Sequence, residues 1–329
     1  MTSSKTSFLL GLLAALMATA LHAKEAPTNN QPLNQAYLSH WFSYDSAEDI
    51  NLSLTPLKGD ALGERAEIHF TSDDGQAVNG LIAFPKNKAS SKKLALALHP
   101  MGIDQQFWWS EKSPLAAQKM TARLREKGYT VISLDARMHG ERGRPGFGPR
   151  ELIKRAHSAE PRLYIDTIIG SVRDYRIVLN WAKTEFSPDE VLVMGYSMGA
   201  QMSLLLASFE PSVDTVLAMV PPFVGSPTSP VAPRIHVQRI TDAKVLWLAG
   251  SSDPHSDQNQ TQETFDQISS SDKTLTWFDA GHRLPPDFLH TALSFFDSLS
   301  CDSLSCDLHS SDLHSSSSSS INSKISGSE

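Results

Sequence analysis

A Gly-x-Ser-x-Gly pentapeptide near the middle of the chain is the stretch best suited to covalent chemistry. It contains Gly195, Ser197 and Gly199, and it follows an apolar run at 191–194 and precedes a helical stretch at 200–208. A strand that turns almost directly into a helix strains the residue between them and exposes its side chain at the sheet edge. The two glycines remove Cβ atoms where strand and helix cross closely. The pattern therefore predicts Ser197 as a nucleophile at a strand–helix turn.

A serine hydroxyl is a poor nucleophile near neutral pH, so a histidine must accept its proton and an acid must orient that histidine. The apolar strand expected at 245–249 leads into a loop with Asp253, and the strand expected at 275–278 leads into a loop with His282. Ligands of parallel sheets bind at the carboxyl ends of the strands, where Ser197 is also expected. We assign His282 as the general base and Asp253 as the orienting acid.

Three other side chains compete for the acid and base roles. Asp279 ends a strand, where aspartates are usually structural turn residues. His255 follows Asp253 in its loop and suits a position on the surface or at a pocket rim. His139 also follows a strand, but no acid-bearing loop is placed to orient it, which favours a histidine that orders a turn beside the site. His282 therefore stays the expected base.

Acyl transfer also needs backbone N–H groups that point at the negative charge developing on the carbonyl oxygen. Met198, at the start of the helix after the nucleophile, provides one such amide. The loop His-Pro-Met-Gly after the strand expected at 93–99 should provide the other, from Met101. These two amides form the expected oxyanion hole.

Strand and helix patterns alternate through the part of the chain that must position these residues. Strands at 66–72 and 78–84, joined by an Asp-Gly turn, predict an antiparallel hairpin near the N-terminus. Further strands are expected at 93–99, 129–134, 215–220, 245–249 and 275–278, and helices near 113–127, 164–183, 200–208, 260–268 and 287–299. Repeated β-α-β units with continuously apolar strands predict an α/β fold with a mostly parallel central sheet and helices on both faces.

The composition is that of an ordinary globular protein. The chain has 329 residues, of which 40% are hydrophobic and 20% charged, enough for a sizeable core in one large or two smaller domains. The net charge of −7 and the lack of a long basic stripe argue against nucleic acid as a partner. No cofactor and no metal ion are expected in the site.

The two ends of the chain differ from its body. Residues 1–23 have Lys5, an apolar run at 8–20 and small residues up to Ala23, which predicts a secretory signal peptide cleaved after Ala23. The run is too short to span a bilayer comfortably and no cysteine follows it, so we expect an exported protein, periplasmic or secreted, without a stable membrane anchor. Residues 24–63 read as an irregular lead-in, and 64–299 as the catalytic domain.

Residues 300–329 form a tail rich in serine and aspartate, with six consecutive serines, which is typical of low-complexity sequence. The tail holds possible metal ligands at Cys301, Cys306, His309 and His314. Few apolar residues are available to pack around a metal there, so the tail is not expected to bind one.

The order Ser197, Asp253, His282 resembles that of the α/β-hydrolase superfamily over about residues 66–299, with His-Pro-Met-Gly in place of the usual His-Gly-x-Gly oxyanion loop. The segments 70–75, 135–142 and 281–286 are most similar to dienelactone hydrolase-like and acyl-peptidase-like esterases. Dienelactone hydrolases proper use cysteine where this chain has Ser197, and prolyl peptidases carry a β-propeller for which there is no room. The resemblance implies an α/β-hydrolase fold and serine esterase activity.

The substrate pocket must be formed by segments that cover the nucleophile. Only the segments 138–161 and 221–244 are placed to cover it, and both are too short for a large lid, so we expect a fairly open pocket. The candidate pocket residues are Tyr196, Trp108, Trp109, His139 and Arg142. Arginines at 142, 144, 150 and 155 suit an anionic substrate, whereas the glutamates at 141 and 151 among them favour a locally paired surface.

The sequence as a whole predicts an exported serine hydrolase that cleaves small carboxylic esters with short acyl groups through an acyl-enzyme. Two alternatives remain open. One is a peptidase or amidase of the same fold, and the other is a non-catalytic binding protein on a hydrolase scaffold.

Overall fold

The computed structural model describes residues 35–45, 50–158 and 160–299. The expected signal peptide and the Ser/Asp-rich tail lie outside the described residues. The chain divides into two compact units, residues 1–38 and 39–329. Of the first unit only the beginning of helix α2 (Gln35–Trp41) is described, and the sheet lies in the second unit.

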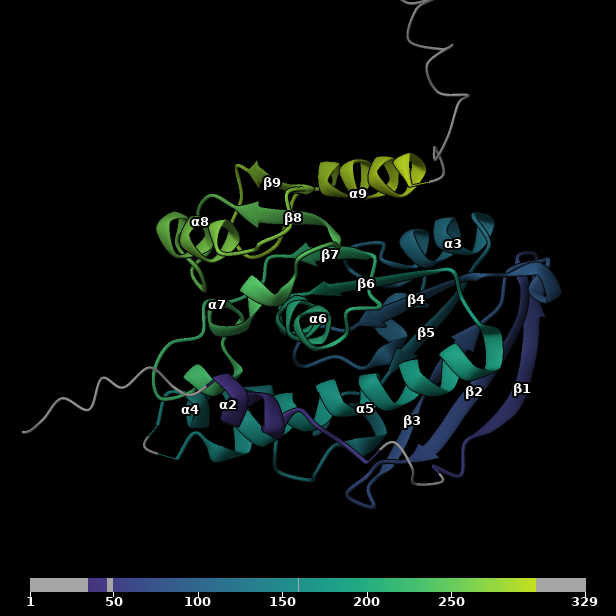
Figure 1. The fold of residues 1–329 in the computed structure, drawn as a ribbon, viewed down its shortest axis with the longest axis horizontal. Helices are drawn as coiled ribbons and strands as arrows, with labels where there is room; N and C mark the ends of the chain where they lie inside the picture. The colour runs from purple at the N-terminus through teal and green to yellow at the C-terminus, as the bar shows by residue number, and fades with distance from the viewer. Residues whose placement is uncertain (1–34, 46–49, 159, 300–329) are drawn as a thin grey trace, which may run out of the picture. The chain divides into compact units, whose positions relative to one another are not determined.

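A twisted sheet runs through the second unit (Figure 1). In the described residues it has nine strands in the order β1-β2-β3-β5-β4-β6-β7-β8-β9. The strands are β1 (Ser53–Asp60), β2 (Gly63–Thr71), β3 (Ala77–Ala83), β4 (Lys93–Leu98), β5 (Tyr129–Leu134), β6 (Glu190–Tyr196), β7 (Thr215–Met219), β8 (Lys244–Gly250) and β9 (Lys273–Phe278). Strands β1, β2, β3 and β5 pair antiparallel in that order, and β5, β4, β6, β7, β8 and β9 pair parallel. The predicted mostly parallel sheet with an antiparallel N-terminal hairpin is confirmed.

Helices cover both faces of the sheet, as the sequence predicts (Figure 1). One face packs against α5 (Arg162–Phe186), α6 (Met198–Phe209) and α8 (Gln258–Asp266), and the other against α3 (Gln118–Glu126) and α9 (Asp287–Ser298). The short helices α4 (Pro149–Ala156) and α7 (Pro233–His236) lie in connections, as do the 3-10 helices η1 (Lys88–Ser90), η2 (Gln105–Trp108), η3 (Gly140–Arg142), η4 (Ser229–Val231) and η5 (Val237–Arg239). No helix of the described residues is long and apolar enough to cross a membrane.

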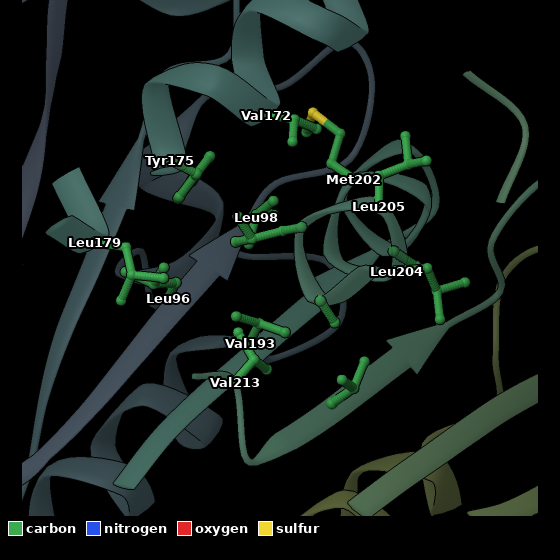
Figure 2. Packing of buried hydrophobic residues seen from close by; sticks show 14 of the residues in the cluster. Leu96, Leu98, Val172, Tyr175, Leu179, Val193, Met202, Leu204, Leu205 and Val213 are labelled. Atoms are coloured by element: carbon green, nitrogen blue, oxygen red, sulfur yellow. The ribbon is translucent and has the colours of Figure 1, made fainter. Parts of the chain in front are cut away.

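Alternation along the parallel strands divides the apolar side chains between the two faces. In β4, Leu96 and Leu98 point toward α5 and α6, whereas Ala95 and Ala97 belong to the cluster under α3 and α9. Figure 2 shows the first face, where the leucines of β4 meet Val172, Tyr175 and Leu179 of α5 and Met202 and Leu205 of α6. Each fully buried leucine contributes about 1.5–3 kcal/mol relative to an exposed one. This packing fixes β4 and β6, the two strands that lead to the site.

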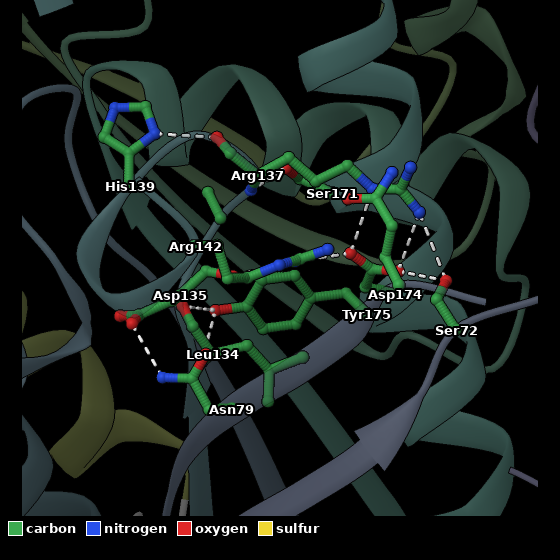
Figure 3. A network of polar contacts seen from close by, with 12 residues as sticks. Ser72, Asn79, Leu134, Asp135, Arg137, His139, Arg142, Ser171, Asp174 and Tyr175 are labelled. Atoms are coloured by element: carbon green, nitrogen blue, oxygen red, sulfur yellow. Dashed lines mark hydrogen bonds and ion pairs between the residues drawn. The ribbon is translucent and has the colours of Figure 1, made fainter. Parts of the chain in front are cut away.

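A buried polar network holds the turn after β5 (Figure 3). Asp174 of α5, only 1% exposed, accepts hydrogen bonds from Arg137 Nε at 3.3 Å, Arg142 Nη1 at 2.7 Å and Ser72 Oγ. A Cβ on Gly170 would lie 2.1 Å from Arg137 Nε, so the absence of a side chain at Gly170 leaves the space that the guanidinium occupies. A buried carboxylate needs such partners, because an unpaired one would cost several kcal/mol. The motif at 135–142 therefore orders a turn.

Strand β1 corrects the expectation that 24–63 is irregular throughout. All eight of its residues are exposed, so the strand lacks the alternation of buried and exposed residues that marks a half-buried strand. It pairs with β2 at the sheet edge through backbone hydrogen bonds, and Arg125 binds Asp60 at its end with two bonds of 2.6 and 2.8 Å. Backbone pairing of this kind leaves no signal in the side-chain pattern.

Candidate active site

Ser197 occupies the single position between β6 and α6, with φ 56° and ψ −118°. Such a backbone conformation costs about 1–3 kcal/mol for a residue with a Cβ. A Cβ on Gly195 would lie 2.2 Å from the carbonyl of Gly199, and a Cβ on Gly199 would lie 2.0 Å from Leu98 O. The strain persists because Ser197 N–H donates to Met219 O at 2.8 Å on β7. The crossing of strand and helix thus has the steric origin that the sequence indicates.

The structure brings Ser197, His282 and Asp253 together in one line of hydrogen bonds. Ser197 Oγ lies 2.7 Å from His282 Nε2, and His282 Nδ1 lies 2.8 Å from Asp253 Oδ2. The other carboxylate oxygen, Oδ1, accepts the backbone N–H of His255 at 2.8 Å. Because Asp253 Oδ2 accepts from Nδ1–H, the neutral imidazole has its lone pair on Nε2, facing the serine hydroxyl. This is the tautomer that a general base requires.

The loops with the acid and the base lie against each other at the carboxyl ends of β8 and β9. Ser252 N–H donates to Ala280 O at 2.9 Å. A Cβ on Gly250, the last residue of β8, would lie 2.2 Å from Gly281 O. Any side chain at this position would push the histidine loop away from the acid loop.

The expected oxyanion residues lie beside Ser197, because Met101 and Met198 both line the cavity that the serine faces. As the first residue of α6, Met198 has an N–H without an acceptor inside the helix. The Met101 loop is fixed by the fully buried His99, whose Nδ1–H donates to Pro100 O at 2.8 Å and whose Nε2 accepts from Ala136 N–H at 2.9 Å. Burial and the neighbouring His139 lower the pKa of His99 to about 4, so the ring is neutral and can make both bonds.

A cavity of ≈ 380 Å³ opens at Ser197 and His282. Its walls come mainly from α4 and from the loop 222–228, the two connections expected to cover the site. The lining residues are Met101, Ile153, Ala156, His157, Tyr164, Ser197, Met198, Pro222, Phe223, Val224, Gly225, Ser226, Thr228, Pro254, His255 and His282. Among the described residues around it, no Asp, Glu, Lys or Arg lines the cavity. The space is therefore predominantly apolar and has imidazoles as its titratable groups, apart from the phenol of Tyr164.

The five residues expected in the pocket do not line this cavity. Trp108 is fully buried in η2, and Trp109 Nε1–H donates to Ser133 Oγ at 2.6 Å. Both indoles are used in packing on the side of the sheet covered by α3 and α9, and Trp108 belongs to that apolar cluster. The sequence places them after the oxyanion loop but does not indicate which way the loop turns.

The other three expected pocket residues are held elsewhere by hydrogen bonds. The buried ring of His139 has Nδ1 2.9 Å from Arg137 O, and Arg142 is bound to Asp174 and to Asp135 O. Tyr196 extends to the far side of the sheet, because side chains of consecutive strand residues point to opposite faces. Of the two interpretations of Arg142, contact with an anionic substrate and local pairing, these bonds support local pairing.

Several cavity residues carry no clear signal in the sequence. Phe223 and Val224 lie in a proline-rich connection, Ile153 lies on the short helix α4, and Tyr164 lies in the first turn of α5. Apart from the catalytic and oxyanion residues, the rim position of His255 is the part of this lining that the sequence anticipates. Its ring lies 4.5 Å from that of His282, centroid to centroid, at an interplanar angle of 79°. Burial and the neighbouring His282 lower the pKa of His255, although Asp253 acts in the opposite direction.

Within the described residues, no three or more His, Cys, Asp or Glu side chains are grouped so that they could hold a metal ion. The cysteines and histidines of the tail, 301–314, lie outside this part of the chain.

Comparison with known proteins agrees with this fold. Residues 108–284, more than half of the chain, match the family model described as the dienelactone hydrolase family. The chain belongs to this family of the α/β-hydrolase superfamily. The chain is thus an ester-cleaving hydrolase. A search of curated proteins found no match.

Solved structures of esterases share the fold. Acetyl xylan esterase 1 from Thermoanaerobacterium sp. JW/SL YS485 is 18% identical, with a TM-score of 0.63 over 80% of this chain and 93% of that one. A cold-adapted esterase from an Arctic intertidal metagenomic library is 19% identical, with a TM-score of 0.59 over 76% and 99% of the two chains. An acetyl xylan esterase from Paenibacillus sp. R4 is 14% identical, with a TM-score of 0.57 over 80% and 91%. At these identities the similarity shows the fold alone.

Proposed function

We propose that the chain is an exported serine esterase that hydrolyses small, neutral carboxylic esters with short acyl groups. The observation that carries the proposal is the pair of hydrogen bonds, 2.7 and 2.8 Å long, that joins Ser197 to His282 and His282 to Asp253 beside a cavity. A serine, a base on its hydroxyl and an acid on the base are the parts that acyl transfer requires. A binding protein would have no need of this alignment.

In the acylation step, Ser197 Oγ attacks the ester carbonyl carbon while its proton moves to His282 Nε2. The carbonyl oxygen becomes an oxyanion, which accepts hydrogen bonds from the N–H groups of Met101 and Met198. The carbon–oxygen bond to the alcohol then breaks, and the alcohol leaves with the proton held by His282. The negative charge of Asp253 stabilises the imidazolium while it exists.

Deacylation repeats the same chemistry with water. His282 Nε2 removes a proton from a water molecule as the water oxygen attacks the acyl carbon, and the oxyanion forms again at Met101 and Met198. Its collapse releases the carboxylic acid and returns the proton to Ser197 Oγ. The free enzyme is restored without any change of oxidation state.

The cavity supports a small and uncharged substrate. Its ≈ 380 Å³ lies near the lower end of the range of small-molecule pockets, roughly 300–1,000 Å³. The side chains of Ile153, Phe223 and Val224 offer apolar contact, and no lysine or arginine of the described residues lines the space to neutralise a carboxylate. A carboxylate on the substrate would be desolvated there without a lysine or arginine as its partner.

The expected result with p-nitrophenyl esters of graded length is a maximum of kcat/KM between acetate and butyrate. Dodecanoate should be about tenfold or more slower, because the long chain exceeds the apolar space available to it. A succinyl monoester should be slower than the neutral butyrate ester, which has the same number of carbons in its acyl chain. Initial rates across the series give these ratios.

A steady rise of kcat/KM with chain length, or a preference for the succinyl ester, would contradict the assignment of the pocket. Aminoacyl p-nitroanilides in the same assay separate an esterase from a peptidase or amidase. A folded protein that hydrolyses none of these substrates would favour a binding role.

Export is proposed from the sequence of residues 1–23 alone, which lie outside the described residues. Expression of the full chain with a secretion pathway should yield a mature protein that begins at Lys24. Intact-mass measurement together with N-terminal sequencing checks the cleavage site. Recovery of the uncleaved chain, starting at Met1 and confined to the cytoplasm, would exclude export.

A further inference from the structure

The hydroxyl of Tyr196 binds the backbone at the candidate base and two residues after it. It donates to His282 O at 2.7 Å and accepts from Leu284 N–H at 3.1 Å. We propose that Tyr196 is a positioning residue, which holds the histidine loop in the geometry that the reaction needs. The inference rests on the proposed esterase function.

Tyr196 links two separate parts of the site because it directly precedes Ser197 in the chain. Its main chain ends β6 and leads into the strained turn, while its side chain reaches the loop that follows β9. The distance between nucleophile and base is thus set partly through a single residue. A shift of about 1 Å in such a pair can cost on the order of 100-fold in rate.

The ring of Tyr196 is itself firmly placed. It is 4% exposed, and it packs against Phe107 at 6.2 Å and Phe288 at 6.3 Å between ring centroids. These contacts lie on the face of the sheet covered by α3 and α9. Tyr196 does not line the cavity, so it cannot act by touching the substrate.

The hydroxyl keeps its proton under working conditions. Burial raises the pKa of Tyr196 to about 12, and the nearby Asp253 acts in the same direction. The phenol therefore donates to His282 O at any pH at which an esterase is assayed. Because Leu284 is buried, its N–H would lose its acceptor if the hydroxyl were removed.

The other hydrogen bonds of the histidine loop hold parts other than the backbone from His282 to Leu284. Ser252 N–H holds the loop before the histidine, at Ala280 O, and Asp253 holds the imidazole ring. After the histidine, Arg283 reaches Pro114 O at 3.0 Å through an exposed side chain. Tyr196 is the buried group that binds the backbone from His282 to Leu284 in the described structure.

The test is Tyr196→Phe, compared with Tyr175→Phe as a matched control. The Tyr175 hydroxyl is also buried, donates to Ala97 O at 2.9 Å and accepts from Leu134 N–H at 2.9 Å, but it lies away from the histidine loop. For p-nitrophenyl acetate, Tyr196→Phe should lower kcat by about tenfold or more with KM within about twofold of wild type. Fluorophosphonate labelling of Ser197 should slow by the same factor. Tyr175→Phe should keep kcat and KM within about twofold, although both variants lower the melting temperature.

A rescue variant separates positioning from mere loss of stability. 4-Aminophenylalanine at position 196 keeps a donor in the same place and should bring kcat back to within about threefold of wild type. It also gives a reading if the phenylalanine variant does not fold.

The positioning role is overturned if Tyr196→Phe keeps wild-type kcat, if only KM changes, if Tyr175→Phe loses kcat equally, or if the amino variant is as slow as the phenylalanine variant. Failure of the proposed function appears differently, as a wild-type protein that neither hydrolyses the ester nor takes up the label.

Discussion

Replacing Ser197 with alanine should lower kcat for p-nitrophenyl acetate by about 10⁴-fold or more, as loss of the nucleophile does in other serine hydrolases. The substitution removes the oxygen that His282 faces at 2.7 Å and leaves a Cβ in the same backbone conformation. The strain of the turn is therefore unchanged, and the melting temperature should stay close to that of the wild type. Initial rates and thermal unfolding measured on the same preparation separate the two effects.

Ser208→Ala is the matched control for this change. Ser208 lies near the other end of α6, is buried, and donates to Leu204 O at 2.7 Å. Its loss removes a buried hydroxyl from the same helix without touching the site, so kcat should stay within about twofold. Ester hydrolysis retained by Ser197→Ala above the background rate would mean that another group attacks the substrate.

Changing Asp253 to asparagine should lower kcat by about 10⁴-fold, the loss seen when the same change is made in another triad enzyme. Activity is lost because both carboxylate oxygens of Asp253 have hydrogen-bond partners, which fix the orientation that an asparagine would take. His255 N–H requires an acceptor at the position of Oδ1, so the asparagine must place its NH₂ group toward His282 Nδ1. The imidazole would then carry its proton on Nε2, facing Ser197, and would be unable to accept the serine proton.

Asp279→Asn controls for the acid assignment. Asp279 lies just after β9 and is exposed, and its loss should leave kcat within about twofold of wild type. Rates of both variants across a pH series, with unfolding midpoints as a check on folding, decide the matter. If Asp279→Asn loses activity and Asp253→Asn retains it, the roles have been assigned to the wrong aspartate.

The elements around the strand–helix turn at Ser197 can be predicted from the sequence because their causes are local. The turn at Ser197 needs small residues two positions before and two positions after the serine. Gly195 and Gly199 meet that need, because a Cβ at either position would collide with neighbouring backbone atoms. Strand β8, which leads into the loop with Asp253, is buried and has a continuous apolar sequence, whereas β9, which leads into the loop with His282, is a partly exposed edge strand. Parallel pairing then brings these loops to the same edge of the sheet.

The pocket cannot be predicted in the same way, because its walls come from segments without periodicity. Ile153 and Phe223 are about 70 residues apart, and only the tertiary fold brings α4 and the loop 222–228 to the same cavity. Trp108 and Trp109 follow the oxyanion loop, yet their direction depends on how η2 packs against the sheet. Proximity in sequence to a functional loop does not determine which side chains face the cavity.

The partners of polar side chains also cannot be predicted from proximity in the sequence. The motif at 135–142 resembles a functional signature, but Arg137 and Arg142 bind Asp174 of α5, which lies more than 30 residues later. Tyr196 shows the reverse, since a residue expected in the pocket instead binds the loop of His282. In both cases the partner that gives the side chain its role is distant in sequence.

The most direct test of the central claim is covalent labelling of the folded protein with a fluorophosphonate, read by intact mass and peptide mapping. We predict one adduct per chain, located on Ser197, with hydrolysis of p-nitrophenyl acetate lost in proportion to labelling and no adduct on Ser197→Ala. A folded wild-type protein that takes up no label, or one labelled at another residue while its activity disappears, would contradict the assignment of Ser197 as the nucleophile.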